Sequence, residues 1–409
     1  MSSNYKRIGD YISQIKIKNK EGKYSELLGI NIDKFFMPSV ANTVGVNLKN
    51  YKIVKKGQFA CNRMHVGRDY RIPIALSDKK TPFLVSPAYD VFEITRTEEL
   101  LPDYLMMWFR RKEYDRNAWY HTDADVRGGL AWEAFCNIKL PVPSIEQQQQ
   151  IVNEYNTVTN RIKLNEQLNQ KLEETAQALY KHWFVDFEFP NEEGKPYKSS
   201  GGEMVYNEEL DKEIPVGWSV ERLTNVLKIF GGGTPKTTVS NYWNGQIPFF
   251  TPKDIGDSFY SINTEKNITE EGLKNCSSKL YPKNTIFITA RGTVGAVNLA
   301  GIEMAMNQSC YAFQEFNYFN YFGHQLALYS MKELIEEATG AVFKALVTKD
   351  FEGKIIICPN INVRKNFNAI ISPLYNNILL NTEQSKTFTN FQSILLSKMS
   401  KVEEEIVKN

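Results

Sequence analysis

Apolar residues recur at steps of three and four along two long stretches of this chain, and polar residues fill the positions between them. The first stretch covers residues 145 to about 185 and the second about 360 to 402. This spacing is typical of heptad helices that bury an apolar seam against a partner. A helix of roughly forty residues spans about 60 Å, so we predict two long helices that pair with each other. Pro373 lies inside the second stretch and predicts a kink there.

The two stretches align without a gap at an offset of 216 residues. The equivalent positions, which we predict to form the helix-pairing seam, are Ile151 and Phe367, Tyr155 and Ile371, Val158 and Leu374, Ile162 and Ile378, Asn165 and Asn381, Leu172 and Phe388, and Leu179 and Leu395. If the helices pair antiparallel, a pseudo-two-fold axis relates the two halves. Asn165 lies midway along its stretch, so we predict that it meets Asn381. An asparagine in an apolar seam fixes the register, because slippage leaves its amide unpaired.

A segment with the mixed signals of an α/β globule precedes each predicted helix. Short apolar and β-branched runs alternate there with Gly, Pro and Asp, and residues 101–114 have helical spacing. The fold class predicted is α+β, with two mixed α/β domains separated by two long antiparallel helices. The predicted parts are a first domain over residues 1–143, a first spacer helix over 144–186, a linker over 187–217, a second domain over 218–359 and a second spacer helix over 360–409. The Gly, Pro, Ser and Glu content of the linker predicts a solvated segment.

Composition narrows the class of protein. With 409 residues, of which 42% are hydrophobic and 12% aromatic, the chain can fill more than one core, which argues against bulk disorder. It has no run of eighteen apolar residues and no apolar signal-peptide core, so we expect no membrane span and a cytoplasmic location. Its five cysteines are scattered, as is typical of free thiols in a reducing compartment.

The net charge of +2 hides an uneven distribution. Residues 186–214 contain nine acidic and three basic side chains, so the rest of the chain carries a net charge of about +8. Basic residues cluster over 63–71 and 110–116 in the first domain. Such clusters favour contact with phosphate groups. An ordinary solvated surface explains them equally well, and charge alone does not separate the two.

Motifs that would make the chain an enzyme are absent or incomplete. Residues 231–237 have the wrong spacing for a phosphate-binding P-loop, and the four histidines and the cysteines lie too far apart in sequence for a zinc signature. Residues 86–89 resemble the loop with which amino-methyltransferases hold a flipped base, but the second proline is missing. Three Glu-Gly-Lys triplets, which would suit a nuclease metal site, lie in turn-like contexts. We therefore predict no catalytic residue, no metal and no cofactor on this chain.

The second domain carries a series of short motifs in a definite order. They are IPVGW at 214–218, GGGTPK at 231–236, YW at 242–243, IPF at 247–249, TPKDI at 251–255, ITEEGL at 268–273, RGTVG at 291–295 and NQ at 307–308. Together with the duplicated helices they resemble the specificity subunits of type I restriction–modification systems. The resemblance covers essentially the whole chain and is weaker in the first domain.

The resemblance implies a chain without catalytic activity that reads a split sequence in double-stranded DNA. Each globular domain would read one half of the target, and the helices would set the gap between the halves. The helices would also dock two adenine methyltransferase subunits, which carry adenosylmethionine, and motor-nuclease restriction subunits would complete the complex. Three alternatives remain: a related bipartite system of type IIB character, a coiled-coil scaffold with no role on DNA, and a self-sufficient methyltransferase.

Basic and amide side chains are the usual readers of base edges and phosphates, and the sequence does not separate the two kinds of contact. The predicted DNA-binding residues are Arg63, Arg68, Arg71 and Arg127 in the first domain, and Thr234, Lys236, Lys253, Arg291, Asn307, Gln308 and Lys344 in the second. We predict that Gly231, Gly232 and Gly233 shape a turn through which the backbone approaches DNA. For Asn307 and Gln308, structural hydrogen bonding at a strand end is an equal alternative.

Overall fold

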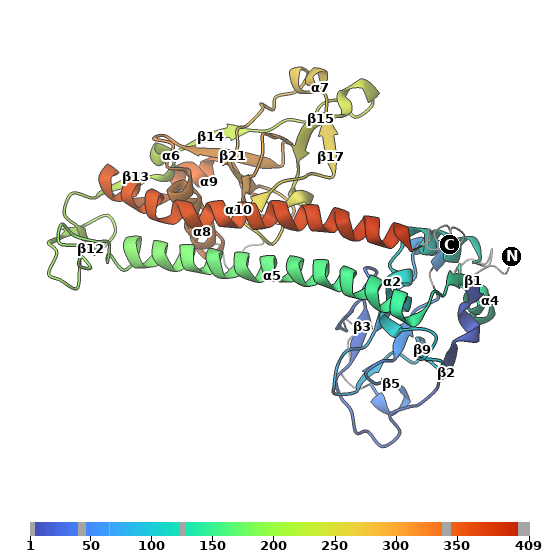
Figure 1. Ribbon diagram of the computed structural model, residues 1–409. Coiled ribbons are helices and arrows are strands. Elements are labelled where there is room, and N and C mark those ends of the chain that lie inside the picture. The colour runs from blue at the N-terminus through green and yellow to red at the C-terminus, as the bar shows by residue number, and fades with distance from the viewer. Residues whose placement is uncertain (1–4, 40–45, 65, 123–127, 338–344, 400–409) are drawn as a thin grey trace. The chain divides into compact units, whose positions relative to one another are not determined.

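The computed structural model describes residues 5–39, 46–64, 66–122, 128–337 and 345–399, and it has the predicted α+β character (Figure 1). The chain folds into two compact units. Unit 1 comprises residues 1–161 and 388–409, and unit 2 comprises residues 162–387. Each unit therefore contains one globular part together with a portion of both long helices.

The globular part of unit 1 is built on a four-stranded antiparallel sheet. Its order is β2 (Ile12–Ile15), β9 (Asp90–Ile94), β6 (Phe59–Cys61) and β7 (Ile74–Leu76). Three two-stranded antiparallel ladders accompany it: β1 (Tyr5–Arg7) with β10 (Lys139–Pro141), β3 (Leu28–Ile30) with β4 (Phe36–Pro38), and β5 (Lys52–Val54) with β8 (Phe83–Val85). The short helices are η1 (Ile8–Asp10), η2 (Leu48–Asn50), α1 (Val66–Asp69), α2 (Pro102–Phe109), α3 (Lys112–Tyr120) and α4 (Trp132–Asn137).

Aromatic side chains fill the core of unit 1. The rings of Phe59 and Phe92 stack with centroids 5.0 Å apart, and Phe109 meets Phe59 edge-on at 5.9 Å. Tyr155 and Met399, which belong to the two long helical stretches, are buried in the same core. The globular part of unit 1 is therefore packed onto its portion of the helix pair.

The single helix predicted over residues 101–114 is instead two helices, α2 and α3. Arg111 has an extended backbone (φ −74°, ψ 139°), and its guanidinium lies over the ring of Trp108, 4.2 Å from the centroid. The turn directs α3 so that Asp115 pairs with Lys34 at 2.7 Å, with both side chains almost fully buried. Helical spacing of apolar residues continues across the turn, so the pattern alone did not reveal it.

Unit 2 contains a five-stranded sheet and a three-stranded sheet. The order of the first is β14 (Leu227–Gly231), β21 (Cys310–Glu315), β18 (Ile286–Thr289), β19 (Val297–Ala300) and β16 (Tyr260–Ser261), antiparallel except for the β16–β19 pair. The order of the second is β17 (Lys266–Ile268), β15 (Trp243–Phe250) and β20 (Ala305–Met306). Strand β13 (Ser219–Arg222) pairs with β22 (Ile355–Cys358). The shorter helices are α6 (Leu223–Val226), η3 (Ser240–Tyr242), η4 (Pro252–Asp254), α7 (Glu270–Lys274), α8 (Asn320–Glu337) and α9 (Thr348–Gly353).

Helix α8 joins the larger sheet of unit 2 to the long helices. It packs on β18, β19 and β21, and its Phe322 reaches the aromatic cluster of the helix pair. In that cluster the rings of Phe184 and Phe367 are 4.8 Å apart and those of Phe184 and Phe322 5.2 Å apart. The globular part of unit 2 thus shares one hydrophobic core with its portion of the helices.

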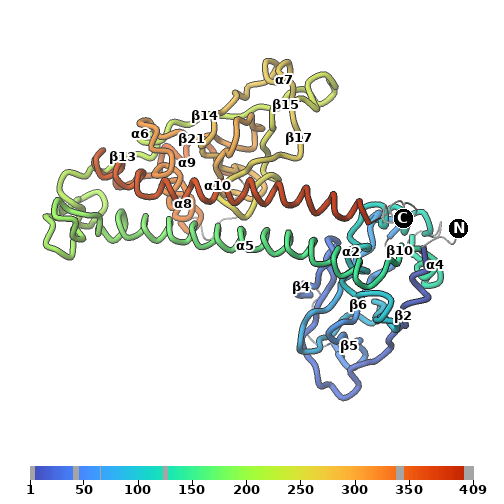
Figure 2. Tube along the Cα trace, viewed as in Figure 1, coloured from blue at the N-terminus to red at the C-terminus, as the bar shows by residue number. Residues whose placement is uncertain are grey.

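The long helices are α5 (Ile145–Phe184) and α10 (Ile361–Lys398) (Figures 1 and 2). They pair antiparallel, because later residues of α5 contact earlier residues of α10. Within unit 2 the rings of Tyr180 and Phe367 are 6.0 Å apart, and within unit 1 the Gln392 amide donates to the Thr159 hydroxyl at 2.7 Å. Helix α10 continues through Pro373. All fourteen residues predicted for the seam are buried or half-buried.

Polar residues meet at the middle of this seam. The Asn165 side-chain amide donates to the Asn381 carbonyl oxygen at 3.3 Å. Asn381 in turn donates to the side-chain oxygen of Asn169 at 2.9 Å, and Asn169 donates to the Thr382 hydroxyl at 3.1 Å. The heptad count did not include Asn169, although it lies at the centre of this network. Asparagine is equally common on exposed helix faces, so the residue type of Asn169 did not mark it as part of the seam.

Residues 187–217, predicted as a solvated linker, are mostly exposed and also contain regular structure. Strands β11 (Met204–Asn207) and β12 (Lys212–Pro215) form an antiparallel hairpin. The ring of Phe189 stacks on Tyr197 at 4.5 Å and on Trp218 at 5.0 Å. A few well-placed aromatic residues therefore order a segment whose average composition is polar.

Candidate nucleic-acid interface

Four motifs that are far apart in the sequence lie together in unit 2. The backbone N–H of Asn307 donates to the Phe250 carbonyl at 2.9 Å, which joins the 307–309 turn to the start of the 251–254 turn. The N–H of Ala290 donates to the Ser309 carbonyl at 2.8 Å, which brings in the turn that carries Arg291. The N–H of Gly233 donates to the Met306 carbonyl at 3.1 Å. The sheets thus gather these four turns, termed the loop cluster, on one part of the second domain.

Two of the three consecutive glycines allow this close assembly. A Cβ atom on Gly232 would lie 2.0 Å from the carbonyl oxygen of Asn307, and one on Gly233 would lie 2.6 Å from the nitrogen of Ser277. At Gly231 nothing lies within 4 Å of the added atom. We predicted that these glycines bring the backbone close to DNA, but the approach seen at Gly232 and Gly233 is to the backbone of the protein itself.

Three of the predicted polar residues support the loop cluster. The Thr234 hydroxyl donates to the side-chain oxygen of Gln308, which links the glycine turn to the 307–309 turn. The side-chain oxygen of Asn307 accepts the N–H of Ser309 at 3.0 Å, so Asn307 stabilises the start of β21. Gln308 is exposed, whereas Asn307 is half-buried.

Lys236, Lys253 and Arg291 are the exposed cations of the loop cluster. Over the described residues none of the three forms an ion pair. The nearest acid in sequence, Asp254, is committed elsewhere: its carboxylate accepts the Thr251 N–H at 2.8 Å and the Glu265 N–H at 2.7 Å. The loop cluster therefore presents three exposed cations that are free to meet phosphate groups.

The predicted arginines that the structure describes in the first domain already have acidic partners. The side chain of Arg63 is only 18% exposed, pairs with Asp90 at 2.6 Å and lies over the Trp132 ring at 5.5 Å. Its chemistry is that of a structural residue that holds β6 to β9. A DNA phosphate would have to replace an existing ion pair at such a residue.

Arg68 and Arg71 are more exposed but are also paired. Arg68 makes two hydrogen bonds to Asp69, at 2.7 and 3.0 Å, and Arg71 pairs with Asp33 at 2.9 Å. The remaining predicted DNA-binding residues, Arg127 and Lys344, lie outside the described residues.

Exposed aromatic side chains in unit 1 were not among the predicted site residues. Tyr70 is 62% exposed and adopts a left-handed backbone (φ 56°), and its ring lies 5.3 Å from that of Trp119. Tyr120 is 81% exposed. Tyr70 lies between Arg68 and Arg71 in sequence, which suits contact with nucleotides. The alternation of aromatic and basic residues along the sequence could have pointed to these side chains. At helical spacing, however, aromatic residues more often belong to a core.

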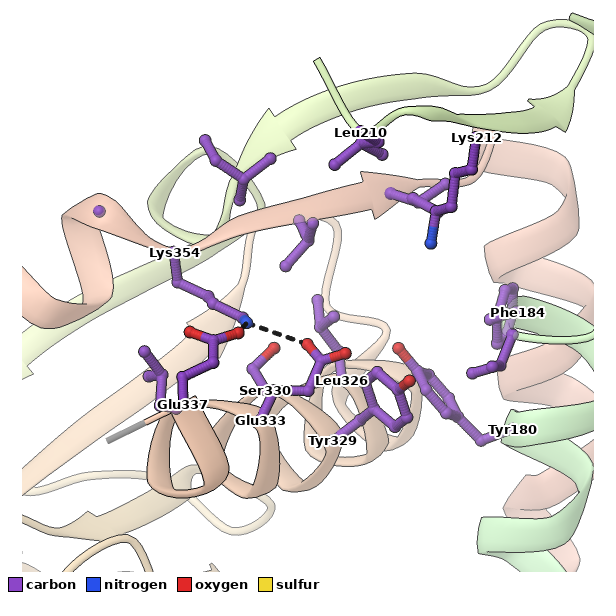
Figure 3. A pocket seen from close by; sticks show the side chains of 16 residues that line it. Tyr180, Phe184, Leu210, Lys212, Leu326, Tyr329, Ser330, Glu333, Glu337 and Lys354 are labelled. Atoms are coloured by element: carbon purple, nitrogen blue, oxygen red, sulfur yellow. Dashed lines mark hydrogen bonds and ion pairs between the residues drawn. The ribbon is translucent and has the colours of Figure 1, made fainter. Parts of the chain in front are cut away.

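A cavity of about 440 Å³ in unit 2 is lined by both charged and apolar side chains (Figure 3). It lies between the end of α5, the β11–β12 hairpin, α8 and β22. The Lys354 ammonium pairs there with Glu333 at 3.0 Å and Glu337 at 2.7 Å. Burial lowers the pKa of Lys354, but its hydrogen bonds to the two glutamates outweigh this and raise it overall. The charge of Lys354 is thus compensated within the cavity.

Two other buried groups, His324 and Cys310, are held in their neutral forms. Burial lowers the pKa of His324 to about 3, and its Nδ1 contacts the Tyr375 hydroxyl at 2.7 Å. Burial raises the pKa of Cys310 to about 12. In the part of the chain that the structure describes, no three His, Cys, Asp or Glu side chains form a group suited to a metal ion, and no helix is long and apolar enough to span a membrane.

Comparison with known proteins connects this geometry to one family. The model of the type I restriction modification DNA specificity domain matches residues 72–174 and 215–389. The specificity subunit of the type I restriction enzyme MjaIX from Methanocaldococcus jannaschii is 30% identical over 285 residues, which cover 67% of this chain and 64% of that protein. The HindI specificity subunit from Haemophilus influenzae is 23% identical over 460 aligned positions, which cover 96% and 97%.

A solved structure supports the fold. The S subunit of a type I restriction–modification system from M. genitalium superposes with a TM-score of 0.55 at 15% identity, over 97% of this chain and 95% of that one. At this identity the likeness concerns the fold alone, and it agrees with the α+β class and the long helix pair.

Proposed function

Because this chain belongs to the type I restriction–modification DNA specificity family, we propose that it selects the DNA sequence on which such a system acts. Each globular domain reads one half of a bipartite target in double-stranded DNA, and α5 and α10 set the gap between the halves. The observation that carries the proposal is the loop cluster of the second domain, where Lys236, Lys253 and Arg291 are exposed and form no ion pair with any described residue.

The chemistry of the loop cluster suits both parts of DNA recognition. Lysine and arginine bind phosphates, which supplies affinity without sequence information. Arginine and glutamine also form paired hydrogen bonds to base edges in the major groove. Arg291 and Gln308 come from turns joined by the Ala290–Ser309 hydrogen bond, so both can face one short stretch of duplex.

The partners in this proposal are two adenine methyltransferase subunits, which carry adenosylmethionine, and motor-nuclease restriction subunits. The chain itself contributes recognition and no catalytic residue. Leu164 and Leu380 support two equivalent docking sites, because they occupy matching positions of α5 and α10 and are 44% and 54% exposed.

Mapping of modified adenines in the host genome tests the proposal. We expect a bipartite motif with one modified adenine in each half, which disappears when the gene for this chain is deleted and returns when it is restored. A methylome that deletion leaves unchanged contradicts the proposal and favours a scaffold without a role on DNA.

Substitution at the loop cluster then tests the site. Arg291→Ala and Lys253→Ala in the assembled complex each remove a cation, so we expect weaker binding of the target duplex. Removing one phosphate-binding cation should reduce the slope of log K against log salt concentration by about one. Lys332→Ala is the matched control, since Lys332 is 72% exposed in the same unit but is paired with Glu336 at 3.9 Å. Equal binding by Arg291→Ala and wild type at low salt places Arg291 outside the interface.

A further inference from the structure

A carboxylate of helix α5 holds the segment that follows Lys253. One oxygen of Glu173 accepts the backbone N–H of Phe259 at 2.8 Å and the hydroxyl of Ser258 at 3.0 Å. Ser258 and Phe259 follow η4, which carries Lys253, so the spacer helix is bonded to the chain that continues from the 251–254 turn of the loop cluster. All of these residues belong to unit 2.

Glu173 is unusual because it is half-buried without a basic partner among the described residues. Burial raises its pKa, the hydrogen bonds from Phe259 and Ser258 lower it, and the charge of Asp257 raises it further, so that the net shift is upward. Taking a carboxylate out of water is costly unless hydrogen bonds replace the lost solvation. The two donors at residues 258 and 259 supply that replacement only while the segment stays in this position.

The same segment is also bonded to the second long helix and to the sheet. The Ser258 hydroxyl lies 3.4 Å from the Thr382 hydroxyl of α10, and the Ser258 carbonyl accepts from the Asn298 amide of β19 at 2.7 Å. Thr382 accepts from Asn169 in the polar layer of the seam. A continuous set of hydrogen bonds therefore runs from the seam between the helices to Ser258.

Packing holds one end of the segment, because the buried ring of Phe259 lies 4.7 Å from that of His324 and 5.5 Å from that of Tyr375. A cavity of about 830 Å³ borders it, lined by Glu166, Gln170, Glu173, Asp257, Ser258 and Thr382. The exposed Lys253 depends for its position on the hydrogen bonds of its segment, to which both Asp254 and Ser258 contribute.

We infer that Glu173 is a positioning residue that couples the recognition surface of the second domain to the helix pair. It holds residues 251–259 against α5, so that Lys253 keeps a defined position relative to the register of the helices. The position equivalent to Glu173 at the 216-residue offset is Thr389, so the first domain does not repeat this carboxylate. The inference rests on the proposed function.

The test compares Glu173→Ala, Glu173→Gln and Glu174→Ala in the assembled complex. Alanine removes the acceptor, whereas glutamine keeps an oxygen that both donors can reach. Glu174 is the matched control, because it is the adjacent carboxylate of α5, is exposed and pairs with Lys171. Binding is measured on duplexes with the target sequence, with one base changed in either half-site, and with the gap altered by one base pair.

We expect Glu173→Ala to bind the target about tenfold more weakly, as the removal of two hydrogen bonds implies. The loss of discrimination should be confined to the half-site read by the second domain, and the penalty for an altered gap should shrink. Glu173→Gln should bind within about twofold of wild type on the same reasoning. Ser258→Ala, which removes one donor, should shift binding in the same direction by a smaller factor.

Three results overturn the inference: unchanged binding by Glu173→Ala, an equal loss at both half-sites, or a Glu173→Gln variant as weak as alanine. If Glu173→Ala does not fold, binding by Ser258→Ala and Glu173→Gln to the same set of duplexes decides whether the inference holds. A wild-type complex without sequence preference contradicts the proposed function itself, which separates the two failures.

Discussion

At the scale of single residues, the surroundings of a side chain decide its role more than its type does. Arg63 and Lys253 are both basic and were both predicted to bind DNA. Arg63 is enclosed by Asp90 and Trp132, whereas Lys253 is exposed without an acid partner among the described residues. The partner of Arg63 is 27 positions away in sequence, and a pattern read along the chain does not reveal it.

The glycines of the loop cluster provide a residue-scale prediction. Gly232→Ala places a Cβ 2.0 Å from the Asn307 carbonyl oxygen, whereas Gly231→Ala meets nothing within 4 Å. We expect Gly232→Ala to lower the free energy of unfolding by about 1–3 kcal/mol, as overpacking does, and to weaken binding of the target duplex. Gly231→Ala should stay within about 0.5 kcal/mol of wild type. Urea unfolding of both variants checks this, and equal stabilities contradict the close approach.

At the scale of elements, the helix pair is stabilised by an apolar seam with a polar layer at its middle. Asn169 is 6% exposed and donates to the Ile378 carbonyl at 3.2 Å in addition to its bonds with Asn381 and Thr382. Apolar seam positions tolerate sliding by one heptad, because each meets another apolar residue. The asparagines do not, since sliding leaves buried amides without partners.

This layer leads to an element-scale prediction. Asn169→Leu leaves the Asn381 amide without its acceptor, so we expect a decrease of about 1–3 kcal/mol in the free energy of unfolding. The double variant Asn169→Leu with Asn381→Leu removes both partners and should recover part of that stability. Gln170→Leu, at an exposed neighbouring position, is the control and should be near neutral. A double variant less stable than the sum of its single changes argues against the pairing.

At the scale of the whole molecule, each long helix is continuous from one unit into the other. Residues 145–161 of α5 belong to unit 1 and the rest to unit 2, and α10 changes unit at residue 388. Each globular part shares its core with the adjoining helix portions, as Tyr155 and Phe367 illustrate. Under the proposed function, the length of the helices therefore sets the gap between the half-sites.

A paired deletion tests that assignment. Removing residues 156–162 and 387–393 takes out one heptad from each helix together with the bonded pair Thr159 and Gln392. Seven residues of helix correspond to about 10 Å, or about three base pairs at 3.4 Å each. We expect the deleted complex to modify targets whose gap is about three base pairs shorter, as methylome sequencing would show. Full modification of the original motif by this variant contradicts the role of the helices as spacers.

Local periodicity explains what could be predicted from the sequence. The long helices, their duplication and the α+β class follow from apolar spacing and turn residues, because each signal lies within a few residues along the chain. The break between α2 and α3 and the regular structure within residues 187–217 did not follow. Arg111 stacks on Trp108, and Phe189 packs between Tyr197 and Trp218, and such contacts are invisible to an average over a window.

The sequence by itself determined that two globular parts each precede a long helix, and it identified the ordered series of motifs in the second part. Only the tertiary structure decided which of the basic and amide side chains are committed to partners and which remain exposed. The reason is physical: ion pairs and buried hydrogen bonds, such as those of Glu173 with Ser258, join residues that only the folded chain brings together.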